Sequence, residues 1–295
     1  MRSGIVTIAG RPNVGKSSLL NALVGRKVSI VSHKPQTTRH RIQGVLHRGE
    51  DQIVFVDTPG LHRQQKRALN RVMNEAAASA LRDVDLVLFV VEAGRWTEED
   101  QAVFERLARG TTPVGLIVNK IDQLKDRAEL LPVLHKLAAM RPYAFVVPVS
   151  ALRRDNLDPL VDEILAQLPE GPALYPPGQV VAHGDDFTVA EVVREKLIRN
   201  LHEELPYALT VEVEHYERDE DIDRVSAIVW VEREGQKKIV IGENGATLKK
   251  VGTAARRELE RQFGRKVFLK LWCKVRENWS DDPKALRRFG LTPDD

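Results

Sequence analysis

In the first half of the chain, short apolar runs rich in β-branched residues alternate with segments whose apolar residues recur every three or four positions. The runs predict buried strands and the wider spacing predicts amphipathic helices. We expect strands at IVTIA (5–9), IVFVD (53–57), DLVLFVVEA (85–93), PVGLIVNK (113–120) and FVVPVS (145–150), an antiparallel hairpin of 42–47 with 52–57, and helices at 16–24, 66–82, 98–109, 127–139 and 156–167. The alternation predicts an α/β fold with a mostly parallel sheet covered on both faces, and a ligand at the carboxyl ends of its strands.

The second half has a different pattern, and a proline-rich stretch separates it from the first. Residues 169–178, PEGPALYPPG, hold four prolines and two glycines, a composition typical of a linker. The spacing Thr188 to Glu191 is that of a capping box and predicts the start of a helix that runs to about residue 202. Strands are expected at 208–216 and 224–233, then a short helix, a helix at 247–262 and a strand at 266–275, so this half predicts an α+β unit. We expect domains at 1–170 and 181–280, joined by a linker at 171–180 and followed by a tail at 281–295.

Composition excludes several classes of protein. The 295 residues suffice for two domains, and the one cysteine, Cys273, rules out an internal disulfide. The first residues are too polar for a signal peptide, and no apolar stretch approaches the roughly 20 residues of a membrane helix. We therefore expect a cytoplasmic protein.

Charge is distributed unevenly within the second half. Residues 203–234 carry 11 acidic and 3 basic side chains, a net of −8, whereas residues 235–276 carry 12 basic and 3 acidic, a net of +9. The basic segment predicts a polyanionic partner. The same numbers are also compatible with two solvated faces, so charge alone leaves both interpretations open.

A phosphate-binding loop follows the first expected strand and opens the first expected helix. GRPNVGKS matches G-x-x-x-x-G-K-[ST] in that context. Backbone N–H groups and the helix N-terminus favour phosphate oxygens there, Lys16 should reach the β- and γ-phosphates, and Ser17 should meet Mg²⁺. The loop residues expected to bind nucleotide are Gly10, Arg11, Pro12, Asn13, Val14, Gly15, Lys16, Ser17 and Ser18.

Two further segments specify the nucleotide as guanine, and a third serves Mg²⁺ and the γ-phosphate. Asn119-Lys120-Ile121-Asp122 ends a strand, and the Asp122 carboxylate accepts a fork of hydrogen bonds that guanine offers and adenine does not. The backbone N–H groups of Ser150 and Ala151 are expected at guanine O6. Asp57-Thr58-Pro59-Gly60 completes the set: Asp57 would hold Mg²⁺ through water, and the Gly60 N–H would approach the γ-phosphate. A threonine within 35–40 is expected to meet Mg²⁺ only when the γ-phosphate is present, which makes that segment an order–disorder switch.

A G-x-x-G turn joins two expected helices in the second half. Its glycines let a nucleic-acid backbone approach, and the order α-β-β-α-α-β is that of a type II KH fold. The helix that follows buries Leu248, Val251, Ala255 and Leu259 and leaves its basic residues outward. The residues expected to contact RNA are Lys237, Lys238, Ile241, Gly242, Glu243, Asn244, Gly245, Lys249, Lys250, Arg256 and Arg257. For the tryptophans at 230, 272 and 279, core packing is the default expectation.

Together these segments resemble the Era-type GTPases of the translation-factor-related class. The resemblance rests on GRPNVGKS (10–17), KPQTTRHRI (34–42), DTPGLH (57–62), NKID (119–122), VSA (149–151), IGENG (241–245) and VRENWSDDPKALRRFGL (275–291), and it covers nearly the whole chain. It implies that Thr38 is the threonine that meets Mg²⁺. It also implies an RNA partner, the 3′ end of 16S rRNA, a role in small-subunit (30S) ribosome maturation, a monomer, and contact with the inner face of the cell membrane.

Leu61 stands where signalling GTPases carry the glutamine that orients the attacking water. In relatives with this replacement, an asparagine equivalent to Asn13 helps to bind K⁺, so we expect slow, potassium-stimulated GTP hydrolysis with Lys16, Asn13, Thr38 and Gly60 as the catalytic groups. Two alternatives stay open. One is a signalling GTPase whose second unit binds protein, and the other is a GTP-dependent tRNA-modifying enzyme.

Overall fold

The computed structural model describes the chain except for residues 33–36, 41, 58–67, 80–82, 182, 202–204, 206–207 and 292–295. The chain divides into two compact units. The first comprises residues 1–29, 38–63 and 73–182, and the second comprises 30–37, 64–72 and 183–295.

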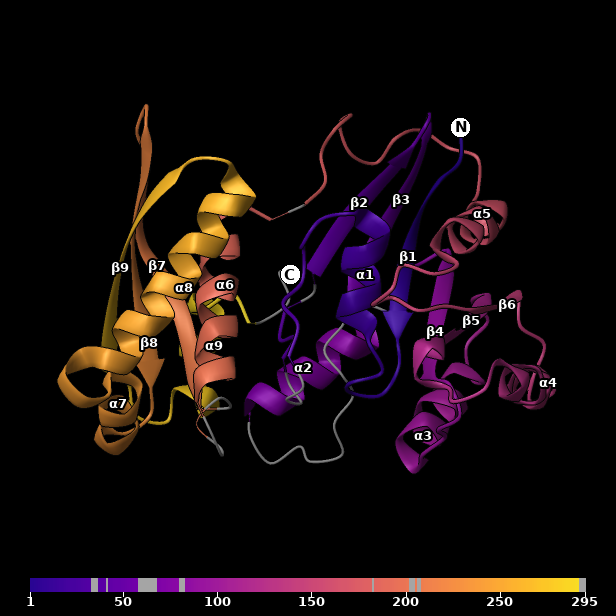
Figure 1. Cartoon of the computed structure of the whole chain (residues 1–295), viewed down its shortest axis with the longest axis horizontal. Helices are drawn as coiled ribbons and strands as arrows, with labels where there is room; N and C mark the ends of the chain where they lie inside the picture. The colour runs from indigo at the N-terminus through magenta and orange to yellow at the C-terminus, as the bar shows by residue number, and fades with distance from the viewer. Residues whose placement is uncertain are drawn as a thin grey trace. The chain divides into compact units, whose positions relative to one another are not determined.

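The first unit is built on a six-stranded sheet in the order β2-β3-β1-β4-β5-β6 (Figure 1). Its strands are β1 (Ser3–Ala9), β2 (Ile42–Arg48), β3 (Asp51–Asp57), β4 (Leu86–Glu92), β5 (Val114–Asn119) and β6 (Phe145–Pro148). All neighbours pair in parallel except β2 and β3, which form the predicted antiparallel hairpin. The mostly parallel α/β fold predicted from the sequence is therefore confirmed.

Helices cover both faces of this sheet. They are α1 (Lys16–Val24), α3 (Glu98–Leu107), α4 (Leu130–Ala138) and α5 (Leu157–Gln167). Helix α2 (Ala68–Ser79) is divided between the two units at residues 72 and 73. Side chains of α3 and α4 share one core cluster with alternate residues of β4 and β5, whereas α1 contacts α5 and β1 to β3. The helix expected from 127 begins at Leu130, after a 3₁₀ turn at Arg127–Glu129. Pro132 lacks a backbone N–H and is accommodated in the first turn of a helix, which favours this start.

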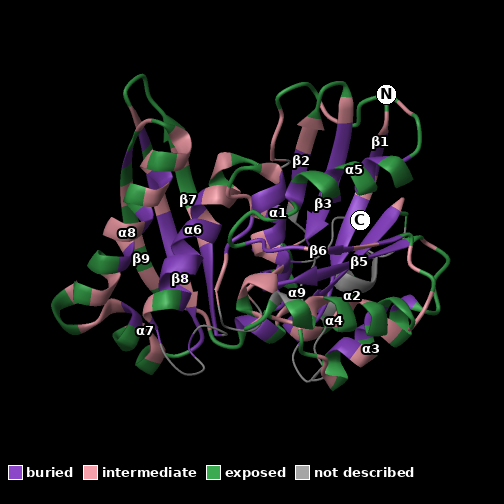
Figure 2. Ribbon diagram, turned by 45° about the vertical axis from the view of Figure 1, so that its right-hand side comes forward, coloured by how far each residue is buried: buried purple, intermediate pink, exposed green. Residues whose placement is uncertain are grey.

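The second unit packs its longer helices on one face of a three-stranded sheet (Figure 1). Its elements are α6 (Asp185–Asn200), β7 (Leu209–Arg218), β8 (Ile222–Val231), α7 (Glu234–Ile241), a 3₁₀ turn at Glu243–Gly245, α8 (Ala246–Phe263) and β9 (Lys266–Val275), followed by a 3₁₀ turn at Trp279–Asp281 and α9 (Pro283–Arg288). β8 pairs antiparallel with β7 and parallel with β9. Buried residues of α6, α8 and the inner sheet face form one core, seen in purple in Figure 2. The α-β-β-α-α-β order predicted from the sequence is confirmed.

The capping box expected at Thr188 and Glu191 is not formed, and the predicted start of this helix was wrong. Helix α6 begins at Asp185 with Gly184 as its N-cap, so Thr188 lies inside the helix, where its hydroxyl donates to the Gly184 carbonyl at 3.3 Å. Glu191 does not reach back to cap the helix because its carboxylate accepts from Arg194 at 2.7 Å. Acidic residues at 185 and 186 favour the earlier start through the helix dipole.

The tryptophans were expected to pack in the core, which is confirmed for Trp279 and wrong for Trp272. Trp279 is fully buried and donates to the Ala208 carbonyl at 3.2 Å, but Trp272 is 47% exposed. Trp272 occupies an outward-facing position of β9, whose residues alternate between the core and the opposite face. The position of Trp272 in the alternation of the strand therefore leaves its side chain exposed, although the side chain is apolar.

The residues expected to form a linker are attached to the first unit. The Val45 N–H donates to the Val180 carbonyl at 2.9 Å, next to an antiparallel bridge between Gly44 and Val181. The Gln52 side chain donates to the Tyr175 carbonyl at 2.9 Å. This segment thus runs along β2 and β3 rather than hanging free in solvent.

Among the described residues, no helix combines the length and the apolar character required to span a bilayer. Cys273 lies half-buried on β9, and burial raises the pKa of its thiol to about 11. A thiol with such a pKa is almost wholly protonated near neutral pH and is therefore a weak nucleophile.

Candidate nucleotide and RNA sites

The phosphate-binding loop connects the end of β1 to the start of α1. Gly15 is the N-cap of α1 with φ 102°, and Asn13, which is exposed, has φ 64°. Lys16 is buried and its ammonium donates to the carbonyls of Gly10 and Arg11, both at 2.9 Å. Burial lowers the pKa of Lys16 to about 8, although the nearby Asp57 carboxylate opposes the shift. The loop therefore presents a helix N-terminus and a desolvated cation to the same place, as an anionic phosphate requires.

The residues assigned to magnesium converge at the carboxyl end of β3. Asp57 has no exposed surface, and its Oδ2 accepts from the hydroxyls of Ser17 at 2.8 Å, Ser29 at 2.9 Å and Thr38 at 3.4 Å. Burial raises the pKa of Asp57, while Lys16 and the three hydroxyls oppose that rise.

The other carboxylate oxygen of Asp57, Oδ1, has no hydrogen-bond partner in the described part of the chain. A buried carboxylate oxygen without a partner beside two hydroxyl oxygens is a set of hard donors that suits Mg²⁺. The site therefore fits the metal that the sequence implied. Ser29 was missed from the sequence because no motif marks it.

The base-recognition residues meet at the carboxyl ends of β5 and β6. Asp122 lies in the 3₁₀ turn Ile121–Gln123, and its Oδ1 accepts from the Ser150 hydroxyl at 2.5 Å. Asn119 is buried; its amide donates to the Val14 carbonyl at 2.9 Å and its oxygen accepts from the Ala151 N–H at 3.1 Å. Asn119 thus ties the phosphate loop to the segment that follows β6.

The two backbone donors expected at guanine O6 are engaged within the protein here. The Ser150 N–H donates to the Asp155 carbonyl at 3.3 Å, and the Ala151 N–H donates to Asn119. Their role at guanine O6 stays a prediction. Thr58, Pro59, Gly60 and Leu61 lie outside the described residues, as does part of the expected switch segment, residues 33–36 and 41.

A buried ion network, which the sequence did not reveal, connects the phosphate loop with the guanine motif. The Arg11 guanidinium is 6% exposed and donates to Asp100 at 2.9 Å and to Glu92 at 2.6 Å. Glu92 also pairs with Lys120 at 3.2 Å. Burial would raise the pKa of Glu92, but the hydrogen bonds from Arg11 and Lys120 outweigh it and lower that pKa. Asp100 in turn accepts from Thr97 at the N-terminus of α3.

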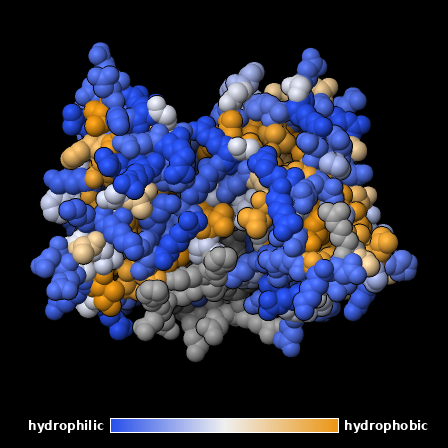
Figure 3. Space-filling view, viewed as in Figure 1, coloured by the Kyte–Doolittle hydropathy of each residue, from blue (hydrophilic) through white to orange (hydrophobic). Residues whose placement is uncertain are grey.

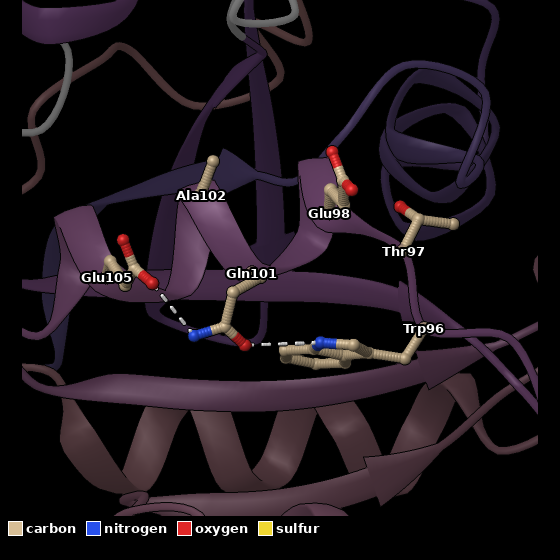
Figure 4. Close-up of a pocket in the computed structure, with 6 residues that line it drawn as sticks. All are labelled: Trp96, Thr97, Glu98, Gln101, Ala102 and Glu105. Atoms are coloured by element: carbon tan, nitrogen blue, oxygen red, sulfur yellow. Dashed lines mark hydrogen bonds between the residues drawn. The ribbon is translucent and has the colours of Figure 1, made fainter.

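A separate pocket of about 480 Å³ lies beside α3 and is lined by Trp96, Thr97, Glu98, Gln101, Ala102 and Glu105. Figure 4 shows the Trp96 indole, the Gln101 amide and Glu105 joined in a row by hydrogen bonds of 3.3 and 3.0 Å. Two carboxylates and no basic side chain line it, so this pocket would repel phosphates. It is not the nucleotide site.

The G-x-x-G turn joins α7 to α8 in the second unit. Gly242 has φ 75° and a Cβ there would collide with the Thr247 side chain, whereas a Cβ on Gly245, at φ 78°, would meet nothing within 4 Å. Asn244, between them, is also left-handed at φ 49° and, like Glu243, exposed; Ile241 ends α7. The turn therefore depends on glycine for its conformation and leaves open space on its outer side.

Basic side chains lie on both sides of this turn and further along α8. Lys238, Lys249, Lys250, Arg256 and Arg257 are exposed and form no ion pair with any residue that the structure describes, while Lys237 pairs weakly with Glu234 at 3.6 Å. In Figure 3 the surface over α8 is predominantly hydrophilic. Uncompensated cations beside a close-approach turn are the chemistry that holds a phosphodiester backbone.

Both units match families of known proteins. A family described as 50S ribosome-binding GTPase matches residues 5–120, and the KH domain family matches residues 204–280. GTPase Era of Xanthomonas oryzae pv. oryzae is 54% identical over 289 residues, which cover 98% of this chain and 97% of that protein. The chain belongs to the Era family of GTPases. The family resemblance and the KH unit predicted from the sequence are thereby confirmed.

Solved structures of Era proteins match the whole chain. One is a variant of Aquifex aeolicus Era bound to GDP·AlF4⁻, and another is Era in complex with MgGDPNP and nucleotides 1506–1542 of 16S ribosomal RNA. Each has a TM-score of 0.95 and 38% identity and covers 99% of this Era-family chain and 100% of the other.

Proposed function

We propose that this chain binds and hydrolyses GTP with Mg²⁺ and binds the 3′ end of 16S rRNA during maturation of the small ribosomal subunit. The observation that carries the proposal is one chain holding both a buried Lys16–Asp57 phosphate and metal site and a G-x-x-G turn bordered by unpaired cations. The complex of a relative with MgGDPNP and this RNA supports the pairing of the two activities.

In the proposed reaction, separate residues bind the phosphates, the metal ion and the base. Lys16 holds the β- and γ-phosphates, Ser17, Thr38 and Asp57 hold Mg²⁺, and Asp122 selects guanine. Bound Mg²⁺ supplies positive charge against the charge that develops on the phosphates. Because the hydroxyls of Ser17 and Thr38 lie 3.1 Å apart beside Asp57, the switch segment can be held in place from the metal site.

Replacing a glycine of the turn by aspartate tests the RNA half of the proposal. We expect Gly245→Asp to weaken binding of an RNA with the sequence of nucleotides 1506–1542 by more than about tenfold, because a carboxylate would face the phosphates. GDP affinity should not change. Gly242→Asp should act similarly, but its steric conflict with Thr247 makes Gly245→Asp the cleaner variant. Fluorescence anisotropy measures the RNA affinity.

Gly264→Asp is the matched control, because it adds the same charge in the same unit at a glycine that also has a positive φ, 69°, and open space around it. Equal RNA affinity of Gly245→Asp and Gly264→Asp would reject the RNA site and return the second unit to a protein partner.

The proposed role of K⁺ in hydrolysis is tested by comparing the rate in KCl with the rate in NaCl. With Leu61 unable to orient water, we propose that K⁺ held by Asn13 supplies the positive charge, so KCl should accelerate hydrolysis over NaCl by up to about a hundredfold, the effect of one fixed electrostatic group. Asn13→Ala should remove the difference and keep GDP binding. Phosphate release measures both rates. Equal turnover in the two salts for the parent chain would contradict this role.

Further parts of the proposal concern the whole molecule. We propose domains at 1–170 and 181–280 with a linker at 171–180 and a tail at 281–295, a monomer in solution, and a cytoplasmic protein that also touches the inner face of the membrane. GTP would order residues 32–42 and 57–66 and thereby control RNA binding. Crosslinking to cellular RNA with and without a nonhydrolysable GTP analogue tests that control.

A further inference from the structure

The outward face of β9 combines exposed aromatic rings with exposed cations. Phe268 is 52% exposed and Trp272 is 47% exposed, and Lys270 lies between them in the sequence of the strand. The Lys270 ammonium lies over the Trp272 ring at 4.8 Å from its centroid. Four residues along a strand separate the two Cα atoms by about 13 Å. Two large exposed rings on one face of a strand, with a cation between them, make that face a candidate interaction surface.

The rest of this sheet face is already covered or paired. Near its other end, Phe289 packs on Trp230 with ring centroids 6.2 Å apart, and Arg288 pairs with Glu212 at 2.8 Å. Nearby acidic residues are also engaged: Glu214 of β7 pairs with Lys274 at 3.7 Å, and Asp219, just after β7, pairs with Arg224 at 3.8 Å.

Along β9 itself, by contrast, Lys266 and Lys270 form no ion pair with any described residue. The uncovered part of the sheet face is therefore aromatic and positively charged, and it is complementary to a polyanion with flat apolar groups.

The two helices that the G-x-x-G turn joins, α7 and α8, pack on the opposite, core-facing side of the same strand. β9 is an edge strand. Gly252 of α8 faces Leu271, and Lys237 of α7 lies close enough to Cys273 to affect the pKa of its thiol. A strand that leaves the turn therefore has only to cross one edge strand to reach Trp272.

We propose that the outward face of β9, formed by Phe268, Lys270 and Trp272, is a second RNA-contact surface on which unpaired bases stack. The inference rests on the proposed RNA binding at the G-x-x-G turn. Aromatic rings stack with every base, and a lysine between them meets the phosphates, so this surface adds affinity with little sequence preference.

The experiment compares a four-nucleotide and a twelve-nucleotide pyrimidine-rich single-stranded RNA on the full chain. A G-x-x-G turn holds about four nucleotides, so only the longer RNA reaches β9. Trp272→Ala should weaken the twelve-nucleotide RNA about tenfold, the effect of one lost stack, and leave the short RNA unchanged. Trp272→Phe should restore most of the affinity. Leu131→Ala is the control, since Leu131 is an apolar side chain 73% exposed in the first unit.

A photocrosslink provides a readout that a merely structural role would not give. A 5-iodouridine near the end of the longer RNA should crosslink to Trp272. If Trp272→Ala leaves both affinities unchanged while Gly245→Asp lowers both, the β9 surface is rejected and the proposed function stands. If Trp272→Ala lowers both equally, the ring only supports the fold and the inference is overturned. If the parent chain binds neither of these RNAs but binds the RNA with the sequence of nucleotides 1506–1542, the β9 surface is rejected and the proposed function stands. If it binds none of the three, the proposed function fails, and the inference fails with it.

Discussion

Asp122→Asn is expected to lower the affinity for GDP by about three orders of magnitude, the range found when a buried hydrogen-bonding site loses its match. In the proposed complex the carboxylate would accept from two guanine donors, whereas asparagine would turn an NH₂ group towards one of them. The Ser150 hydroxyl, which donates to Oδ1 of Asp122 at 2.5 Å, would still fix the side chain. Xanthosine diphosphate, which carries an oxygen in place of the guanine amine, should bind the variant better than GDP does. Calorimetry measures both affinities.

Asp126→Asn makes the same chemical change at an exposed residue and serves as the control. Asp126 accepts from the Ala128 N–H at 2.9 Å, a bond that asparagine can also make. Undiminished GDP affinity of Asp122→Asn would show that guanine is recognised elsewhere, and the placement of the nucleotide across β1, β3 and β5 would then be wrong.

Asp100→Ala is expected to destabilise the first unit by about 3 kcal/mol, because removing one partner of a buried ion pair leaves an uncompensated charge. Asp100 has no exposed surface and accepts from Arg11 at 2.9 Å. Glu92 still pairs with Arg11, so we expect the lower end of the usual 3–5 kcal/mol range. GDP affinity should also fall, because Arg11 belongs to the phosphate loop.

Glu99→Ala is the matched control, since Glu99 is an exposed acid in the same helical turn. Hydrogen exchange of peptides that span β4 and α3 measures the loss of local stability without interference from the second unit. If exchange in Asp100→Ala equals that in Glu99→Ala, the ion network does not hold these elements together.

The sequence predicted most of the regular elements because their periodicity is local. Helix α1 and strand β9 have the bounds that were expected, Lys16–Val24 and Lys266–Val275. The phosphate loop and the NKID segment were found because each gathers its chemistry within a few consecutive residues. Parallel strands then bring their carboxyl ends together, so motifs far apart in the chain share one edge of the sheet.

What the sequence did not reveal depends on contacts between distant residues. Ser29 donates to Asp57, and Arg11 pairs with Asp100, 89 positions along the chain. No spacing encodes such pairs. The start of α6 was placed too late because the acidic residues at 185 and 186 favour an earlier N-terminus than the spacing of Thr188 and Glu191 indicated. Trp272 was misplaced because the alternation of β9 decides which face it occupies.

The chain segment bound to β2 has a consequence for dissecting the protein. β2 is the outer strand of the six-stranded sheet, and a strand with free backbone groups invites pairing between molecules. Val180 and Val181 cover part of that edge, and Gln52, nearly devoid of solvent exposure, bonds to Leu174 and Tyr175. A fragment that ends at residue 168 would expose this edge of β2 and self-associate. A fragment that ends after residue 181 would keep Val180 and Val181 paired with β2 and stay monomeric.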